Sequence, residues 1–86
     1  MAFAYMLRCR DGTLYVGWTV DLNRRLAQHQ AGRGSRYTKG RRPVRLVYSE
    51  ELATQREARQ REAALRRLRA PAKRRLASAN SPLSTG

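Results

Sequence analysis

The sequence is poor in acidic residues, in cysteine and in long apolar runs, and each shortage excludes a class of protein. Its single cysteine, Cys9, excludes an internal disulfide and a zinc site built on cysteines, and it favours a reducing, cytoplasmic setting. No apolar run approaches the ~20 residues of a membrane-spanning helix, and residues 1–7 lack the length and the basic start of a signal peptide. We therefore expect one small domain of 86 residues with no membrane association.

Basic residues dominate the charge. Nineteen Lys and Arg against six Asp and Glu give a net charge of +13, and all the basic residues except Lys39 and Lys73 are arginine. A guanidinium group offers a planar pair of donors that matches two phosphate oxygens, whereas a Lys ammonium acts as a point charge. This balance predicts nucleic-acid binding with a strong salt dependence. A general arginine bias of the genome, or attachment to a ribosome, would give the same composition.

The first predicted element is a β-hairpin, in which residues 3–7 and 13–18 flank an Asp-Gly turn. A two-residue loop would place Tyr5 and Tyr15 on opposite faces of the hairpin. A three-residue loop with Gly12 in a left-handed conformation would place both on the same face. Only the second geometry permits a shared site, and the sequence leaves both open. Tyrosines in strands are usually packing residues, which is the simpler interpretation.

A helix and a third strand follow. Residues 21–31 have helical periodicity, and Gly32 is suited to end the helix. One face of this helix carries Leu22, Arg25, Leu26 and His29. Residues 33–42 form a loop with room for one helical turn, and Pro43 leads into a strand over residues 44–48. The alternation predicts that one face of this strand carries Val44, Leu46 and Tyr48.

The second half of the chain is predicted to be helical. Thr54 and Glu57 form a capping box that begins a helix reaching about Arg69, and Pro71 suits the first turn of a last helix through Leu76. The inward positions of the longer helix are Ala58, Leu65 and Leu68. The order ββαβαα predicts an α+β fold with a small three-stranded, mainly antiparallel sheet flanked by helices. The domain is expected over residues 1–77, with a disordered tail over residues 78–86.

Two polar features on the predicted helices could carry chemistry. Glu62 lies at the margin of a buried stripe, where a carboxylate needs a partner or a metal ion. A salt bridge to one of the many arginines is the structural alternative. Arg25 and the only histidine, His29, lie one helical turn apart and could grip a phosphate and assist proton transfer. Their structural alternative is a surface arginine with a packed stem and a histidine that fills space.

The order of the motifs resembles the GIY-YIG nuclease domain. The first motif would be Ala4-Tyr5-Met6 and the second Tyr15-Val16-Gly17. Residues 19–26 with His29 and Gly32 resemble the helix that carries the family's phosphate-binding arginine. The segments that fit the third strand are Tyr37-Thr38, Arg42-Pro43-Val44 and Leu46-Val47-Tyr48. Ala58 and Arg61-Glu62 match the segment that bears the metal-binding glutamate, and the match spans residues 2–76. The chain is most similar to the small stand-alone, single-domain bacterial members.

The resemblance implies phosphodiester hydrolysis with one Mg²⁺ or Mn²⁺ ion held by Glu62. Arg25 would stabilise charge on the phosphate, and Tyr5 would be the general base for the attacking water, although Tyr15 remains an alternative. Tyr15 and His29 would position water or share proton transfer, and Gly17 would let the backbone approach the phosphate.

Further residues are expected to contact nucleic acid. They are Gly17, Trp18, Arg24, Arg33, Arg36, Tyr37, Lys39, Arg41 and Arg42. Ala4 and Met6 depart from the first motif, and Trp18 stands where many members have Lys or Tyr. The expected activity is an endonuclease with little sequence specificity, on DNA or alternatively RNA, acting as a monomer in DNA repair or recombination. The competing hypothesis is a basic module that binds nucleic acid without cutting it.

Overall fold

The sheet has three strands and is antiparallel throughout. The computed structural model describes residues 1–79. The strands are β1 (Ala2–Arg8), β2 (Leu14–Thr19) and β3 (Arg45–Leu52). They lie in the order β2-β1-β3, with β1 paired to both neighbours. The predicted α+β class, with its small antiparallel sheet, is confirmed.

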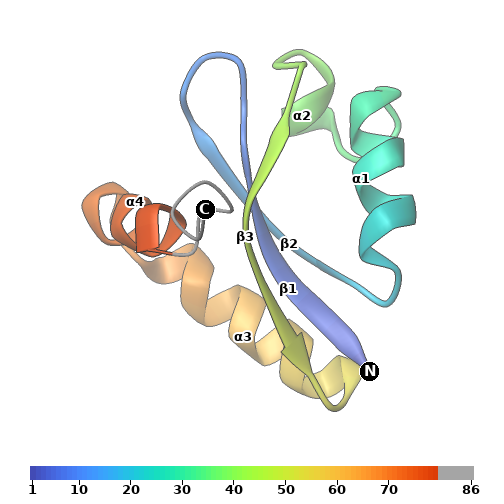
Figure 1. Ribbon diagram of the computed structural model, residues 1–86, viewed down its shortest axis with the longest axis vertical. Helices are drawn as coiled ribbons and strands as arrows, with labels where there is room; N and C mark the ends of the chain where they lie inside the picture. Colours follow the sequence, from blue (N-terminus) through green and yellow to red (C-terminus); the bar gives the residue numbers. More distant parts are fainter. Residues whose placement is uncertain (80–86) are drawn as a thin grey trace.

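Four helices cover the two faces of the sheet. They are α1 (Leu22–Gln30), α2 (Arg36–Lys39), α3 (Gln55–Arg67) and α4 (Ala70–Ala79). Figure 1 shows α1 and α2 on one side of the sheet and α3 and α4 on the other. None of the helices within residues 1–79 has the length and apolar character needed to cross a membrane.

The hairpin has the longer of the two possible loops. Cys9 and Thr13 close it through a backbone hydrogen bond of 2.9 Å, and Gly12 has φ +85°, a conformation that costs a glycine little. In the resulting register Tyr5 pairs with Gly17 and Leu7 pairs with Tyr15. Tyr5 and Tyr15 therefore lie on the same face of the sheet, so the geometry that permits a shared site is confirmed.

The helix boundaries follow local capping. Asp21 caps α1 by accepting a hydrogen bond from the backbone N–H of Arg24, and Gly32 beyond its end has φ +82°. Thr54 caps α3 as predicted, but the helix ends at Arg67, because the backbone of Leu68 is extended. The last helix is longer than predicted and ends at Ala79. The predicted tail was therefore wrong at residues 78–79, and its remainder, residues 80–86, lies outside the described residues.

A β-bulge in β3 corrects the predicted face of Tyr48. Met6 pairs with Tyr48 and Leu7 pairs with Leu46, so Val47 is an extra residue with no partner on β1. The extra residue shifts the alternation, because the side chains on either side of a bulge no longer follow period two. Val44 and Leu46 face α1, whereas Tyr48 packs with Val47 on the side of α3. The prediction that these three residues share a face was wrong for Tyr48.

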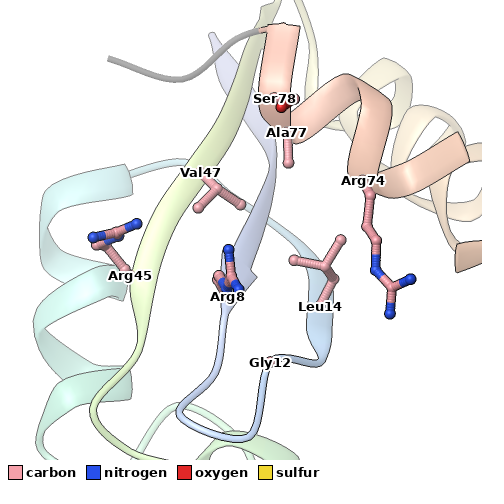
Figure 2. Close-up of a pocket in the computed structure, with 8 residues that line it drawn as sticks. All are labelled: Arg8, Gly12, Leu14, Arg45, Val47, Arg74, Ala77 and Ser78. Atoms are coloured by element: carbon pink, nitrogen blue, oxygen red, sulfur yellow. The ribbon is translucent and has the colours of Figure 1, made fainter. Parts of the chain in front are cut away.

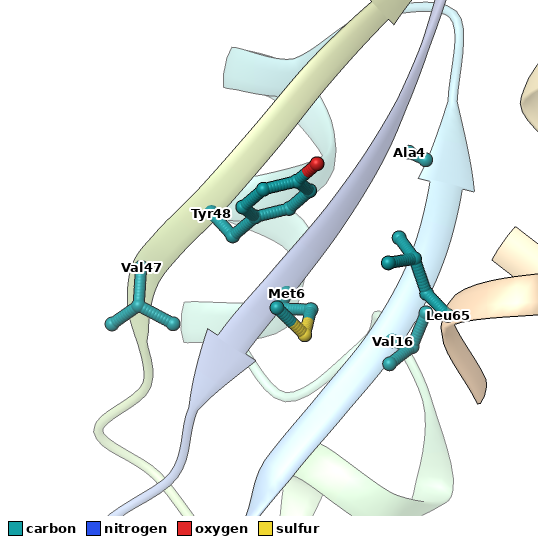
Figure 3. Packing of buried hydrophobic residues seen from close by; sticks show 6 residues of the cluster. All are labelled: Ala4, Met6, Val16, Val47, Tyr48 and Leu65. Atoms are coloured by element: carbon teal, nitrogen blue, oxygen red, sulfur yellow. The ribbon is translucent and has the colours of Figure 1, made fainter. Parts of the chain in front are cut away.

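The sheet separates two apolar clusters. The cluster under α3 and α4 contains Ala4, Met6, Val16, Val47, Tyr48 and Leu65, as Figure 3 shows. The cluster under α1 contains Tyr5, Leu7, Cys9 and Val44, with Leu22 and Leu26 packed against it. Burial of one large apolar side chain stabilises a fold by roughly 1.5–3 kcal/mol. The two clusters fix α1 and α3 on opposite faces of β2, which is an edge strand.

Candidate active site

Tyr5 crosses the edge strand over a glycine. Its side chain is 1% exposed, and Gly17 lies directly opposite on β2. A Cβ atom at Gly17 would stand 2.6 Å from the Tyr5 hydroxyl oxygen and 2.7 Å from the ring carbon that bears it. Because Gly17 has no side chain, the Tyr5 ring can lie across β2 with its hydroxyl group at Gly17.

His29 meets this hydroxyl from α1. Its ring is fully buried, and Nε2 lies 2.8 Å from the Tyr5 hydroxyl oxygen, while Nδ1 lies 2.8 Å from Thr38 Oγ1. A Cβ atom at Gly34 would stand 2.2 Å from His29 Nδ1, so a glycine is needed there too. Helix α2 presents Thr38, whose hydroxyl donates to the Ser35 carbonyl oxygen at 3.4 Å.

The hydrogen bonds that run from Tyr5 to Ser35 have one arrangement in which every proton has an acceptor. Burial raises the pKa of Tyr5 to about 12, against the opposing effect of the nearby Arg25. Burial, with the Arg25 charge second, lowers the pKa of His29 to about 4, so both groups are neutral at pH 7. If Tyr5 donates to Nε2, Nδ1–H donates to Thr38 and Thr38 donates to Ser35, every proton has an acceptor. The other tautomer leaves the Tyr5 proton without an acceptor within residues 1–79.

Arg25 lies one helical turn before His29 and is held at both ends of its guanidinium group. One terminal nitrogen donates to Gln28 Oε1 at 3.2 Å and the other to the Gly34 carbonyl oxygen at 3.0 Å. Its Nε is buried and makes no hydrogen bond of normal geometry within residues 1–79, although the guanidinium group lies near enough to the Tyr5 hydroxyl to act on the pKa of Tyr5. An unsatisfied buried donor costs about 1–3 kcal/mol, so this nitrogen is suited to an added acceptor such as a phosphate oxygen.

Glu62 approaches from α3, on the other face of the sheet. Its side chain is 15% exposed and pairs with Arg66, which also donates to the Val16 carbonyl oxygen of β2. The Glu62 charge is close enough to act on the pKa of Tyr5. The salt bridge considered as the structural alternative is therefore present, and it lies at the strand over which Tyr5 passes.

A metal site here would rest on Glu62 alone. Within residues 1–79, no group of three or more His, Cys, Asp or Glu side chains could hold a metal ion. Mg²⁺ usually keeps several waters and binds through one or two carboxylates together with substrate phosphates. One half-buried carboxylate beside a position for a phosphate fits that requirement, provided that Arg66 releases Glu62.

Comparison with known proteins identifies the family of the chain. A model of the GIY-YIG catalytic domain matches residues 1–75. The chain belongs to the GIY-YIG family. A UPF0213 protein of Streptococcus pneumoniae serotype 4 is 46% identical over 79 residues, which cover 92% of this chain and 80% of that protein. A UPF0213 protein of Bacillus pumilus is 53% identical over 60 residues, covering 70% of this chain and 61% of that protein.

A solved structure shares the fold. The solution NMR structure of a UPF0213 protein from Bacillus halodurans is 36% identical, with a TM-score of 0.60 over 95% of this chain and 88% of that chain. The GIY-YIG domain is a nuclease domain, so the family to which this chain belongs acts on nucleic acid. The similar proteins named above are small bacterial proteins.

The structure brings together the five residues expected to be catalytic in a GIY-YIG domain. Tyr5, Arg25 and His29 lie around the glycine of β2, and Glu62 lies across the same strand. The Tyr15 ring contacts the ring of His29 at a centroid distance of 5.2 Å and that of Tyr5 at 6.5 Å. Because Tyr5 forms the hydrogen bond to His29, it is better placed than Tyr15 to pass on a proton.

The aromatic residues expected to contact nucleic acid have partners in the protein. Tyr37, which is 37% exposed, stacks on Tyr15 at 5.9 Å and carries the Arg41 guanidinium 4.0 Å from its ring centre. Trp18 is half-buried, and the Arg59 guanidinium lies 5.8 Å from its ring centre. Neither ring is free of contacts with other side chains, as a surface for stacking of bases would be.

The expected basic contacts fall into two groups. Arg24, Arg33, Arg36 and Lys39 are exposed, and Arg24 lines a hollow beside Trp18 and Arg25. Arg41 pairs with Asp11 at 3.1 Å and donates to the Tyr37 carbonyl oxygen. Arg42 donates to the carbonyl oxygens of Lys39 and Gln30. The last two side chains therefore hold the loop around α2, while the first group is free to meet a ligand.

The sequence analysis did not identify the residues that hold the side chains expected to be catalytic. Residues 33–42 were expected to form a loop with room for one helical turn, and Tyr37-Thr38 to fit the third strand. The strand assignment was wrong, because Thr38 lies in α2, where it contacts His29 while the Gly34 carbonyl oxygen accepts from Arg25. Ser35 three residues before Thr38 is an N-cap pattern that could have located α2. Gly17 also has a role that the sequence did not reveal, because the closest atoms to its absent side chain belong to Tyr5.

Proposed function

We propose that this protein is a divalent-metal-dependent endonuclease that hydrolyses phosphodiester bonds in nucleic acid, with DNA as the favoured substrate. The observation that carries the proposal is the Arg25 Nε beside the Tyr5–His29 pair, buried and without a hydrogen bond of normal geometry within residues 1–79. This position offers an anion a donor and offers the attacking water a proton acceptor within one site.

Arg25 binds and polarises the scissile phosphate. Its two terminal nitrogens are already fixed by Gln28 and Gly34, so little side-chain entropy is lost when a phosphate oxygen accepts from Nε. The rigid guanidinium group then faces the charge that develops on the phosphate during attack.

Tyr5 receives the proton of the attacking water while its own proton passes to His29 Nε2. The low pKa of His29 opposes this transfer in the free protein. A bound phosphate neutralises part of the Arg25 charge that lowers this pKa, and its own negative charge favours the protonated ring. The transfer is thereby coupled to substrate binding. Thr38 keeps Nδ1 as the donor, so Nε2 stays free to accept.

Glu62 would hold one Mg²⁺ or Mn²⁺ ion, which supplies charge neutralisation at the phosphate when it is bound. Arg66, 61% exposed, leaves this carboxylate at little cost because its guanidinium group is already largely hydrated. Water and substrate oxygens complete the coordination.

The remaining surface favours recognition of the sugar-phosphate backbone of the substrate. The free basic side chains around α1 and α2 are suited to phosphates, which carry no sequence information, so little sequence specificity is proposed. RNA is the alternative substrate. We place the enzyme in the cytoplasm as a monomer, where breaks or branches of DNA during repair or recombination would supply substrates, and where the Cys9 thiol stays reduced.

The test is a cleavage assay on labelled DNA and RNA with Mg²⁺ or Mn²⁺, against EDTA. Wild-type protein cuts only with the metal, and Glu62→Gln cuts more slowly by more than the roughly 10–100-fold that loss of an outer-shell partner costs. Glu51→Gln is the matched control, because Glu51 is an exposed carboxylate on β3 with no hydrogen bond or ion pair within residues 1–79. This control keeps the wild-type rate.

Two outcomes would contradict the proposal. Cleavage by Glu62→Gln at the wild-type rate would remove the metal role of this carboxylate. Binding of every substrate without products would favour the competing function, a module that holds nucleic acid without cutting it. Binding in EDTA is measured alongside, because loss of the Glu62 charge leaves the affinity unchanged or raises it, so that a lower rate of the variant reports on cleavage and not on binding.

A further inference from the structure

A row of hollows leads away from the active site around the tip of the hairpin. The first hollow is lined by Tyr15, Tyr37 and Arg66, together with Leu14 and Lys73. The second shares Leu14 and Lys73 with the first and adds Gly12 and Arg74. The third shares Gly12, Leu14 and Arg74 with the second and adds Arg8, Arg45, Val47 and Ala77. Because each hollow shares residues with the next, the three form one groove.

The groove passes from one face of the sheet to the other. Tyr15 belongs to the cluster under α1, whereas Leu14, Val47 and Ala77 belong to the cluster under α3 and α4. Leu14 lines all three hollows, and Tyr15 is the next residue on β2, so the groove bends around the start of this edge strand. Figure 2 shows its far end, where Arg8 stands between Val47 and Leu14, and Arg74 reaches down from α4.

The groove is basic, and four of its five cations are unpaired within residues 1–79, the exception being Arg66, which pairs with Glu62. Within residues 1–79 no carboxylate lines any of the three hollows, and the side chains of four cations that line them have no ion pair or hydrogen bond. These cations are Arg8, Arg45, Lys73 and Arg74. Arg8 and Arg45 are directly opposite each other on paired strands, an arrangement of like charges that destabilises a sheet. An anionic ligand would relieve this repulsion.

The groove is widest beside Tyr15 and small in volume beyond it. The first hollow has a volume of about 440 Å³, whereas the second and third have about 210 and 260 Å³, below the ~300 Å³ at which small-molecule sites begin. As consecutive parts of one groove they suit a chain-like polyanion, whose phosphates meet the cations while its bases or sugars contact Leu14, Val47 and Ala77.

We propose that this groove, lined by Arg66, Lys73, Arg74, Arg8 and Arg45, holds a single strand of nucleic acid that continues from the scissile phosphate around the hairpin. The proposal rests on the nucleic-acid substrate proposed above and names its class. The bend around the edge strand selects a flexible single strand, because double-stranded DNA has a persistence length of about 150 base pairs and resists such a turn. None of these five cations is among the basic residues that sequence reasoning selected.

The test measures binding in EDTA, where no cleavage is needed. The probe is a fluorescein-labelled oligothymidylate of about 20 nucleotides, longer than the roughly 4–16 nucleotides that single-strand-binding folds cover. The groove variant is Lys73→Glu/Arg74→Glu. The control is Arg56→Glu/Arg75→Glu, which changes the net charge equally at two exposed arginines outside every hollow of the groove.

The groove variant weakens binding at least about tenfold more than the control, since each lost phosphate contact lowers affinity beyond the effect of net charge. Equal weakening by the two variants would overturn the groove. A second arm uses a duplex of the same length. If the groove variant weakens duplex binding as much as single-strand binding, the assignment to a single strand is overturned.

Arg8→Gln tests the far end without a risk of misfolding. Removal of one charge from the Arg8–Arg45 pair relieves repulsion, so the melting temperature is equal or higher while binding of the oligothymidylate is weaker. Unchanged binding would overturn the far part of the groove. If the protein binds through the groove and cuts nothing, the nuclease function fails and the groove stands. If the protein cuts nucleic acid but the groove variant binds the oligothymidylate as well as its control does, only the groove proposal is overturned.

Discussion

At the scale of single residues, burial determines the protonation states of the two buried groups of the site. The Tyr5 hydroxyl and the His29 ring are both taken out of water, which raises the pKa of one and lowers that of the other. Both are therefore neutral in the free protein, and the proton between them stays on Tyr5. In the proposed mechanism, the charge of a bound substrate changes this balance, so proton transfer is expected only when the site is occupied.

The buried His29 predicts an acid-dependent loss of stability. Its pKa is about 4 in the folded protein and about 6.5 in an unfolded chain, so below pH 6.5 the unfolded chain takes up the proton first. The free energy of unfolding therefore falls as pH drops from about 6.5 towards 4. Urea unfolding at pH 7 and pH 5 measures the fall, and His29→Gln, which has no group titrating there, loses less. An equal loss in both proteins would mean that His29 is not held neutral.

The positions of the candidate site residues were easier to predict from the sequence than those of the residues that hold them. Tyr5, Arg25, His29 and Glu62 are spaced by regular strand and helix periods, so their faces could be inferred before their contacts were known. Thr38 and Gly34 contact His29 and Arg25 across a loop, with no period to reveal them. Such contacts depend on the tertiary path of residues 33–42.

At the scale of elements, β2 separates the Tyr5–His29 pair from Glu62, the carboxylate proposed to bind the metal ion. Helix α1 brings His29 and Arg25 to one face of the sheet, α3 brings Glu62 to the other, and Tyr5 passes over Gly17. The strand can be crossed at that position only because its residue has no side chain.

Replacement of Gly17 by alanine tests this crossing. The new methyl group would lie 2.6 Å from the Tyr5 oxygen, so the ring must shift, and overpacking of this kind costs about 1–3 kcal/mol. Gly17→Ala is expected to lower the free energy of unfolding by that amount and to slow cleavage. Gly40→Ala is the control, because nothing lies within 4 Å of its added carbon, and its unfolding free energy should not fall. If the two variants are equally stable, Tyr5 does not lie over Gly17.

The boundaries of the helices and strands show which sequence signals are sufficient to predict local structure. Thr54 with Glu57 located the start of α3, because a capping box satisfies backbone donors locally. The bulge at Val47 could not be predicted, because it arises from the pairing of β3 with β1 and has no local turn residue. The hairpin register lies between these cases, since the sequence allowed two loops and pairing selected one.

At the scale of the whole molecule, a charge of +13 is confined within extents of 30 × 28 × 26 Å. At about 0.01 M salt the Debye length is about 30 Å, so every charge repels every other, whereas at about 0.1 M it is about 10 Å. We therefore expect added salt to raise the melting temperature of the free protein. The same salt should weaken its complex with single-stranded DNA, because each counterion released into a more concentrated salt solution gains less entropy.

These opposite responses distinguish a binding surface from a mere excess of charge. Thermal unfolding and oligothymidylate anisotropy are measured over the same salt series, from about 0.01 to 0.2 M. The slope of log affinity against log salt is about −0.7 for each phosphate contact on a single strand, so it counts the cations that meet the ligand. Lys73→Glu/Arg74→Glu makes this slope shallower and Arg56→Glu/Arg75→Glu does not, although both lower the net charge equally and reduce the repulsion that salt relieves. A flat affinity in wild-type protein would mean that the arginines meet no phosphates and contribute only to the instability of the free chain.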